Sequence, residues 1–132
     1  MRIYPDYESD KNLLIRPYFD DMVSVLKASD IAVSRAGSLS LSEIQAAGLA
    51  SILIPYPHAA ADHQRKNAKF MVEMDASLYL EDSETDENRL GEKITALLDN
   101  PEKLLELQTN ALKLAKYDGV QKIVEQLRTI SA

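Results

Sequence analysis

The sequence predicts an α/β fold: a parallel sheet of about four strands with flanking helices and a helical C-terminal tail. Short apolar runs rich in β-branched residues alternate with helical patterns of ten or more residues, which is typical of βαβ units. From residue 86 onward only helical patterns occur. The chain has 132 residues, 45% of them hydrophobic, which is enough for one core but not for two. We therefore expect a single domain over residues 1–132, with residues 86–132 as its helical tail.

Four short apolar runs bounded by turn residues are predicted to be strands. They are residues 13–16, closed by Pro17, and then residues 31–34, 51–54 and 77–80. Between the first two runs, residues 21–28 place Met22, Val23, Val25 and Leu26 on one helical stripe, and Asp20 or Asp21 can cap this helix. We expect this helix to contribute packing only.

The tail is predicted to contain three helices. Leu90, Ile94, Leu97 and Leu98 form one stripe, Pro101 marks the start of a second helix, and residues 120–127 form a third, short one. The second helix has leucines at positions 104, 105, 107, 112 and 114. The acidic run at residues 81–87 is interpreted as a solvated loop that also favours the start of the next helix.

Composition argues against several classes of function. The net charge is −6, with 15 basic residues spread among 21 acidic ones, which disfavours a general nucleic-acid binder. Cysteine is absent, and two histidines five residues apart (His58 and His63) with one nearby aspartate do not make a convincing metal site. No run of about 18 apolar residues occurs and residues 1–6 lack a signal-peptide core, so we expect a soluble chain that can still touch a membrane.

The segment from Ser34 to Asn67 contains most of the functional information. A strand that ends at Ser34 and a helix that begins near Ser38 leave a tight turn around Gly37, which permits unusual dihedral angles and close approach of a ligand. The first helical turn has N–H groups without intrahelical partners and the positive end of the helix dipole, so a phosphate is a natural ligand. The Ser38 and Ser40 hydroxyls lie within reach of such a group.

A second interpretation of the same residues stays open. Residues 40–43 read Ser-Leu-Ser-Glu, the spacing of a capping box, in which Glu43 would bond back to a backbone N–H instead of a ligand. At the other end of this helix, Gly48 fits the left-handed C-terminal position.

A polar loop follows the third predicted strand. Pro55 and Pro57 force an extended exit, and the loop ends in Asp-His-Gln-Arg-Lys-Asn at residues 62–67. This loop lies at the carboxyl end of a parallel strand, the usual ligand side of such sheets. Taken alone, His63 is more typical of a surface or helix-capping residue than of a catalyst.

These residues resemble the MurG-type glycosyltransferases, which add N-acetylglucosamine to undecaprenyl-linked muramyl-pentapeptide in bacterial cell-wall synthesis. The resemblance runs in order through several motifs at compatible spacing, with the tail agreeing more loosely. The motifs are residues 18–22 (Tyr-Phe-Asp-Asp-Met), residues 29–43 (from Ser-Asp-Ile to Leu-Ser-Glu), residues 55–58 (Pro-Tyr-Pro-His) and residues 63–68 (His-Gln-Arg-Lys-Asn-Ala).

The resemblance implies a two-domain fold of the GT-B type, of which this chain is the later part of the Rossmann-like C-terminal domain that holds UDP-N-acetylglucosamine. By analogy, the Phe19 backbone meets the uracil and Glu43 accepts hydrogen bonds from the ribose hydroxyls. The resemblance places Ser38, Leu39 and Ser40, with Gly37 beside them, at the diphosphate or the outer hydroxyls of the sugar. It implies that His63, Gln64 and Asn67 read the sugar hydroxyls and that Arg35 steadies the loop or the phosphates. The Glu43 role is physically sensible, because each charge-assisted bond is worth roughly 1.5–3 kcal/mol.

The parts of the family that are missing from this chain define further expectations. The family's proposed general base and its lipid-contacting surface lie in the N-terminal domain, so no catalytic residue is assigned here and the isolated chain is expected to be inactive. No cofactor is expected. The lipid-linked acceptor would be bound through the missing domain, and the full enzyme would be cytoplasmic and peripheral on the inner face of the membrane. A sheet cut from a larger one exposes an edge, so a homodimer across that edge is expected.

Two alternatives to an inverting N-acetylglucosamine transferase stay open. The first is a stand-alone nucleotide-sugar-binding subunit of a split glycosyltransferase, which would need a separate acceptor protein. The second is a nucleotide-sugar epimerase, which would need catalytic acids and bases in the missing half and which the serine-rich loop fits less well.

Overall fold

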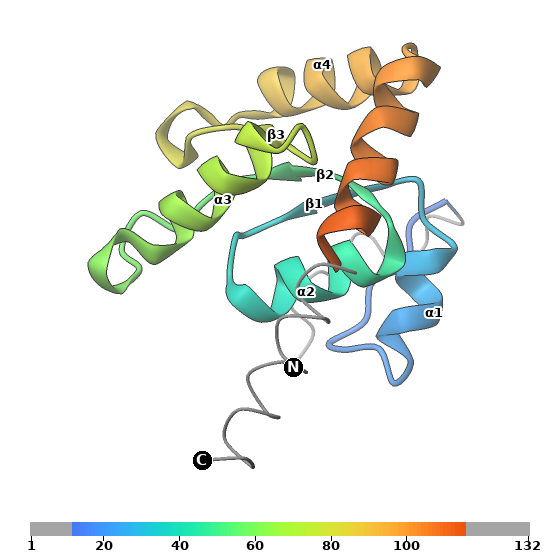
Figure 1. Ribbon diagram of the computed structural model, residues 1–132, viewed down its shortest axis with the longest axis horizontal. Coiled ribbons are helices and arrows are strands. Elements are labelled where there is room, and N and C mark those ends of the chain that lie inside the picture. The colour runs from blue at the N-terminus through green and yellow to red at the C-terminus, as the bar shows by residue number, and fades with distance from the viewer. Residues whose placement is uncertain (1–11, 116–132) are drawn as a thin grey trace, which may run out of the picture.

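The computed structural model describes residues 12–115, which form a three-stranded parallel sheet with helices on both faces (Figure 1). The strands lie side by side in chain order: β1 (Ile31–Ser34), β2 (Ala50–Leu53) and β3 (Leu78–Tyr79). Both neighbouring pairs are parallel, with Ala32 aligned with Ser51 across the first pair. The predicted α/β class with a parallel sheet is confirmed, but the sheet has three strands among the described residues where four were predicted.

The missing strand is the first one, because residues 13–16 join no ladder. Leu13 and Leu14 are exposed, and no other described strand lies beside β1 on its free side. The bounds of β2 and β3 differ only slightly from the predicted strands at residues 51–54 and 77–80. Ile54 lies just outside β2 but its N–H still donates to the Ser34 carbonyl at 2.9 Å, and Leu80 N–H donates to the Leu53 carbonyl at 3.0 Å beyond β3.

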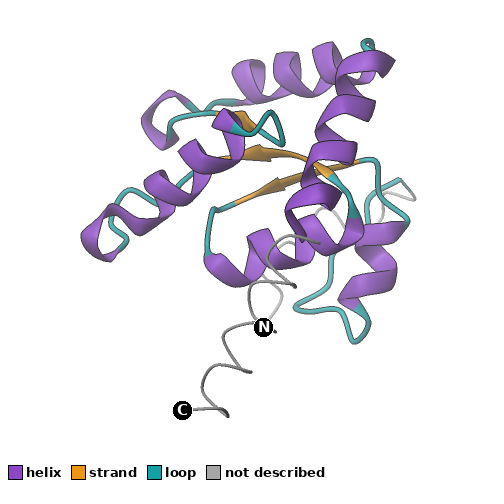
Figure 2. Ribbon diagram, viewed as in Figure 1, coloured by secondary structure: helices purple, strands orange, loops and turns teal. Residues whose placement is uncertain are grey.

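The helices occupy the connections between the strands (Figure 2). Their bounds are α1 (Met22–Lys27), α2 (Ser38–Ala47), η2 (Ala60–Asp62), α3 (His63–Glu73), η3 (Asp82–Glu84) and α4 (Glu87–Leu98), where η denotes a 3-10 turn. A further helix is described over residues 101–115. The short helix predicted at residues 120–127 lies outside the described residues.

Local sequence sets the ends of these helices as predicted. The Asp21 carboxylate accepts from the Ser24 N–H at 3.1 Å at the start of α1. Gly48 ends α2 in the left-handed conformation, with φ of 62°. The last described helix begins at Pro101. The Asn100 side chain, just before it, accepts a hydrogen bond from the Lys103 N–H at 3.2 Å.

The core has two parts, one on each face of the sheet. On one face, Ile52 packs with Ile54, Leu80 and the partly buried side of α4, and Ala50 packs with Leu97 and Leu107. On the other face, a larger cluster joins α2 and α3 to β2 and to the end of the described tail; it contains Ala36, Leu41, Ile44, Leu49, Leu53, Ala68, Met71, Ala76, Ala111 and Leu114. β2 is buried throughout because it is the central strand.

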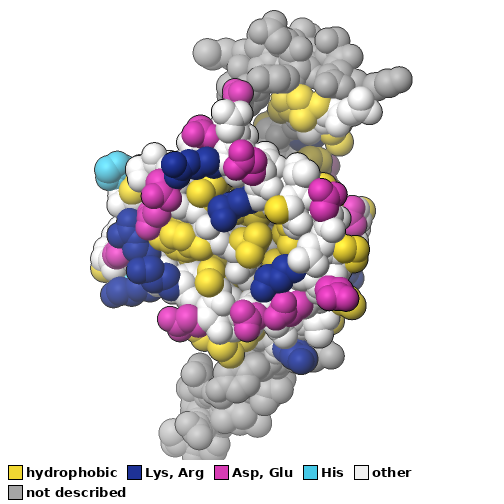
Figure 3. Space-filling view, turned by 90° about the horizontal axis from the view of Figure 1, so that it is seen from above, with side chains coloured by type: hydrophobic (Ala, Val, Ile, Leu, Met, Phe, Trp, Pro, Cys, Tyr) yellow, Lys and Arg dark blue, Asp and Glu magenta, His cyan; other side chains and the backbone are white. Residues whose placement is uncertain are grey.

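The surface over α4 is mixed in character. Figure 3 shows acidic and basic side chains interspersed with hydrophobic ones on this face, without a continuous basic stripe. Leu98, which the stripe pattern predicted to be packed, is instead exposed, and so is Leu105 on the next helix. Within residues 12–115, no helix is long and apolar enough to cross a membrane.

Candidate functional site

The turn between β1 and α2 leaves the N-terminus of α2 without a side-chain cap. Gly37 is the N-cap residue, and as a glycine it has no side chain that could cap the helix. The first intrahelical bond runs from the Leu41 N–H to the Gly37 carbonyl at 3.0 Å. The N–H groups of the first turn, at residues 38–40, therefore have no intrahelical partner and can bind an anion such as phosphate.

Gly37 itself does not need unusual dihedral angles. Its φ of −70° and ψ of 152° are ordinary extended values that any residue adopts, which corrects the predicted reason for a glycine here. A Cβ built at this position would meet Nε2 of Gln64 at 3.8 Å, an ordinary contact. The remaining reason for a glycine is close approach of a ligand to the backbone.

The capping-box interpretation of residues 40–43 does not hold, because the helix begins at Ser38 and not after Ser40. Glu43 lies in the second turn of α2 and is half-buried. Within residues 12–115, its carboxylate has no hydrogen bond or ion pair. Leu39, one helical turn earlier on the same side of α2, is 74% exposed. A free carboxylate and an exposed apolar side chain thus lie beside the open helix end.

The start of α3 contributes the second group of predicted residues. His63 is the first residue of α3 and is exposed. Gln64 and Asn67 are half-buried and reach the β1–α2 turn: Oε1 of Gln64 accepts from the Ala36 N–H at 3.2 Å, and Nδ2 of Asn67 donates to the Ala36 carbonyl at 3.0 Å. The structure therefore brings the turn and the start of α3 together, as the sequence predicted for the carboxyl ends of neighbouring strands.

Arg35 connects the ends of the three strands. Its Nη1 donates to the Asp82 carboxylate at 2.6 Å and to the Ile54 carbonyl at 3.2 Å. The guanidinium carbon also lies 5.7 Å from the centroid of the Tyr56 ring. Of the two roles that the resemblance implied for Arg35, steadying the loop is the one that these contacts supply.

Asp82 was missed by the sequence reasoning, which took residues 81–87 as a solvated loop. Several carboxylates of this run have specific partners. Among them, Asp82 pairs with Arg35, and Asp86 caps α4 by accepting from the Arg89 N–H at 2.8 Å. The available signal was position, because Asp82 follows the third predicted strand at its carboxyl end.

A second polar network fixes the start of α3 against the end of β3. The Tyr79 hydroxyl donates to Glu81 at 2.7 Å, and Arg65 pairs with Glu81 and with Asp62. The bond from Tyr79, followed by the bond from Arg65, lowers the pKa of Glu81, so this carboxylate stays ionised. Burial raises the pKa of Tyr79, with a further contribution from Glu81. This network supports α3 and leaves His63 outside it.

Phe19 lies apart from these contacts in the sequence. It is half-buried in the turn that precedes α1, and α1 packs against α2. Among residues 12–115, no hydrogen bond or ion pair joins Phe19 to the other predicted site residues.

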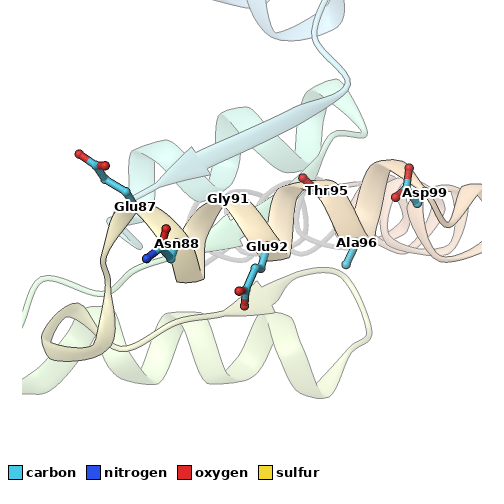
Figure 4. Close-up of a pocket in the computed structure, with 7 residues that line it drawn as sticks. All are labelled: Glu87, Asn88, Gly91, Glu92, Thr95, Ala96 and Asp99. Atoms are coloured by element: carbon cyan, nitrogen blue, oxygen red, sulfur yellow. The ribbon is translucent and has the colours of Figure 1, made fainter.

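A shallow depression of about 530 Å³ follows α4, away from the predicted site residues (Figure 4). Its lining is Glu87, Asn88, Gly91, Glu92, Thr95, Ala96 and Asp99. Figure 4 shows that Glu87 and Glu92 point to different sides of the helix, so the charged groups do not converge. Within the described part of the chain, no cluster of three or more His, Asp or Glu side chains can hold a metal ion.

The chain is similar in sequence to known proteins. Two bacterial proteins, each named UDP-N-acetylglucosamine–N-acetylmuramyl-(pentapeptide) pyrophosphoryl-undecaprenol N-acetylglucosamine transferase, are similar to the chain. The protein from Carboxydothermus hydrogenoformans is 44% identical over 81% of this chain and 29% of its own length. The protein from Thermoanaerobacter sp. is 39% identical over 92% of this chain and 34% of its own length. The chain thus spans about a third of these relatives.

A solved structure and a family model also match the chain. The crystal structure of Acinetobacter baumannii MurG matches with a TM-score of 0.72 and 28% identity, over 88% of this chain and 33% of that one. The model of the glycosyltransferase family 28 C-terminal domain matches residues 2–126, nearly the whole chain. The chain therefore belongs to the glycosyltransferase family 28 C-terminal domain family.

Proposed function

We propose that this chain is the donor-binding part of an inverting glycosyltransferase that transfers N-acetylglucosamine from UDP-N-acetylglucosamine to undecaprenyl-linked muramyl-pentapeptide. The observation that supports it most is the N-terminus of α2, which has no N-cap side chain, together with the Glu43 carboxylate in the next turn, which has no hydrogen bond or ion pair among residues 12–115. A diphosphate needs N–H donors, and a ribose needs an acceptor for its two hydroxyls. The relatives' names supply the nature of the sugar and of the acceptor.

The proposed binding residues divide by the part of the donor that each would meet. The Phe19 backbone meets the uracil and Glu43 the ribose. The turn at Gly37 and the first residues of α2, Ser38, Leu39 and Ser40, hold the diphosphate and the nearest sugar hydroxyls. His63, exposed at the start of α3, meets the sugar. Gln64 and Asn67, in the first turns of α3, read the sugar hydroxyls beside His63, and Arg35 steadies the loop through its contacts at the strand ends.

We further propose that the chain binds the donor without transferring it. Transfer requires a base near the acceptor hydroxyl and an acceptor aligned with the anomeric carbon. We assign no residue of this chain to either task, and we place the lipid-linked acceptor on the part of the relatives that the chain does not span. Steady turnover of the donor and the lipid acceptor by the isolated chain would contradict this part of the proposal.

The acceptor's chemistry also suggests a location. An undecaprenyl chain lies in a membrane, so the complete enzyme would work in the cytoplasm, peripheral on the inner face of the cell membrane. Fractionation of cells that express the complete enzyme tests this, and recovery outside the cytoplasmic and membrane fractions would exclude it. We propose, in addition, that two copies of this chain pair through the β1 edge, which has no neighbouring strand within residues 12–115.

Titration of the chain with UDP-N-acetylglucosamine and with UDP, followed by amide chemical shifts, tests donor binding directly. We expect shifts at Phe19, at residues 37–43 and at His63. In Glu43→Ala the dissociation constant should rise about tenfold or more, since a charge-assisted hydrogen bond is worth roughly 1.5–3 kcal/mol and 1.4 kcal/mol corresponds to tenfold.

Glu92→Ala is the matched control, because Glu92 is an exposed glutamate that lines the depression on α4. It should bind both ligands as the unmodified chain does. If Glu92→Ala loses binding while Glu43→Ala keeps it, the site lies on α4 and the proposed location is wrong. If a folded chain shows no shift at millimolar ligand, donor binding by this part alone is refuted.

A further inference from the structure

An exposed ion pair joins the loop after β3 to the turn that opens α2. Nη1 of Arg35 donates to Oδ1 of Asp82 at 2.6 Å, across 47 positions of sequence. The side chains of Arg35 and Asp82 are 50% and 38% exposed. Because exposed ion pairs contribute little to stability, folding free energy does not explain this contact. Its main consequence is geometric, since it fixes where the Arg35 side chain lies.

Asp82 belongs to a turn that is held by its own hydrogen bonds. It begins η3, in which the Glu84 N–H donates to the Glu81 carbonyl at 3.1 Å. The Thr85 hydroxyl donates to the same carbonyl at 2.8 Å, and the Thr85 N–H donates to the Asp82 carbonyl at 3.1 Å. The Asp82 carboxylate is therefore a fixed attachment point for Arg35.

Arg35 connects this attachment point to the β1–α2 turn. It directly follows β1 and lies two positions before Gly37, the N-cap of α2. Its Nη1 also donates to the Ile54 carbonyl at 3.2 Å, and its guanidinium carbon lies 5.7 Å from the centroid of the Tyr56 ring. Of these contacts, the one with Asp82 is the shortest and the one between opposite charges.

The orientation of the guanidinium depends on the Asp82 carboxylate. With the carboxylate present, the charge of Arg35 is compensated and the side chain lies along the strand ends. Without it, Arg35 would keep its weaker contacts to backbone carbonyls and to an aromatic ring, and its charge could turn toward an anion at the α2 N-terminus.

We propose that Asp82 is a positioning residue of the donor site: through Arg35, it holds the β1–α2 turn where the N–H groups of residues 38–40 can meet the diphosphate. The ligand in this proposal rests on the proposed function, because the α2 N-terminus is where the diphosphate is proposed to bind. Asp82 acts through Arg35 and does not itself touch the ligand. The loop after β3 thereby becomes part of the structure that supports the site.

The affinity for UDP tests this proposal by the sign of its change. We would measure dissociation constants of UDP and UDP-N-acetylglucosamine by calorimetry for the whole 132-residue chain and for Asp82→Asn, which keeps the size of the side chain and removes its charge. Both constants should rise by the same factor, about threefold to tenfold, because both ligands contain the diphosphate. A lower constant for UDP would mean that the released Arg35 binds the phosphates directly, and an unchanged constant would mean that the ion pair is only a surface contact. Either result would overturn the proposal.

Glu84→Gln is the matched control, because it removes the same charge from the same turn. The ion-pair partner of Glu84 is Arg89, at 3.7 Å. Both dissociation constants should stay within about twofold of the unmodified chain. If Glu84→Gln weakens binding as much as Asp82→Asn does, the effect comes from the total charge of the loop and the proposal is wrong.

Asp82→Glu tests the ion pair itself. A carboxylate that is one methylene longer can still reach the Arg35 guanidinium, so this variant should recover most of the affinity that Asp82→Asn loses. An Asp82→Glu chain that binds as weakly as Asp82→Asn would contradict the proposed role of the ion pair.

Amide chemical shifts without ligand test the connection from Asp82 to the turn independently of donor binding. In Asp82→Asn, the amide signals of residues 36–40 should move, while those of residues 49–51 keep their positions and show that the variant is folded. In Glu84→Gln, the signals of residues 36–40 should stay in place. Unchanged signals at residues 36–40 in Asp82→Asn would refute the connection. If the unmodified chain binds neither ligand, the proposed function fails for this chain, and the chemical shifts alone decide whether Asp82 positions the turn.

Discussion

Gly37 shows how a single residue can indicate a ligand when the fold does not explain it. Its dihedral angles are ordinary, and the nearest atoms of the described chain leave space for a Cβ. Neither the backbone nor the packing around Gly37 therefore selects glycine. A ligand that approaches the α2 N-terminus closely would select it.

Gly37→Ser should separate these two effects. Serine is preferred over glycine at an N-cap, so the free energy of unfolding should stay equal or rise by about a few tenths of a kcal/mol. The added side chain would occupy the space proposed for the phosphates, so the dissociation constant for UDP should rise about tenfold or more. Thermal unfolding and calorimetric titration of the same preparation measure both quantities.

Gly91→Ala provides the control, because Gly91 lies inside α4 with nothing within 4 Å of a built Cβ. Alanine in a helix interior is worth up to about 1 kcal/mol over glycine, so this variant should be more stable and bind UDP unchanged. Full UDP affinity in Gly37→Ser would mean that no phosphate approaches this turn.

The candidate site could be predicted from sequence only as far as residue type and order allow. The position of Gly37 before a helix and the polar cluster at His63 and Gln64 follow from local pattern. The bonds from Gln64 and Asn67 to Ala36 do not, because they depend on how α3 lies across the turn. Arg35 and Asp82 are 47 residues apart, and their pairing likewise depends on the alignment of strand ends.

At the scale of elements, the ends of three helices were predicted well and the strand count was not. Gly48, Pro101 and the aspartate before α1 act through their own neighbours in sequence, so the pattern contains the required information. A strand depends on a partner. Residues 13–16 have a suitable apolar pattern, but among the described residues no strand pairs with them.

The acidic run before α4 gives a test at this scale, because its members have different structural roles. Asp86 is the N-cap of α4 and accepts from the Arg89 N–H. Asp86→Ala should lower the free energy of unfolding by about 1 kcal/mol, within the usual range of about 0.5–2 for loss of an N-cap. Denaturant unfolding followed by circular dichroism measures this difference.

Glu84→Ala is the comparison within the same run. Glu84 is exposed and faces Arg89 at 3.7 Å, so its removal should change stability by less than about 0.5 kcal/mol. If the two variants destabilise the chain equally, the run acts through its total charge, as a solvated loop would, and the cap is not the important contact.

At the scale of the whole molecule, helices cover the two faces of the sheet, while its edges have no neighbouring strand within residues 12–115. Helices cover both faces around the central strand β2, whereas β1 has no neighbour on its free side within residues 12–115. Val33, in the middle of β1, is 43% exposed although its register partner Ile52 is completely buried. Unpaired backbone groups beside apolar side chains favour pairing with another strand.

We predict that the chain dimerises through this edge. Sedimentation of the whole chain should show a mass that rises with concentration toward that of two copies. Val33→Lys should shift the chain to the monomer without loss of helical signal, because a charged side chain on an edge strand opposes strand pairing.

Val23→Lys is the matched control: Val23 is 56% exposed on α1, so a lysine there should leave the dimer intact. A constant monomeric mass across concentrations of about 1 mM and below would exclude an edge-paired dimer. If both lysine variants dissociate the dimer equally, association depends on general surface hydrophobicity, and β1 is not the interface.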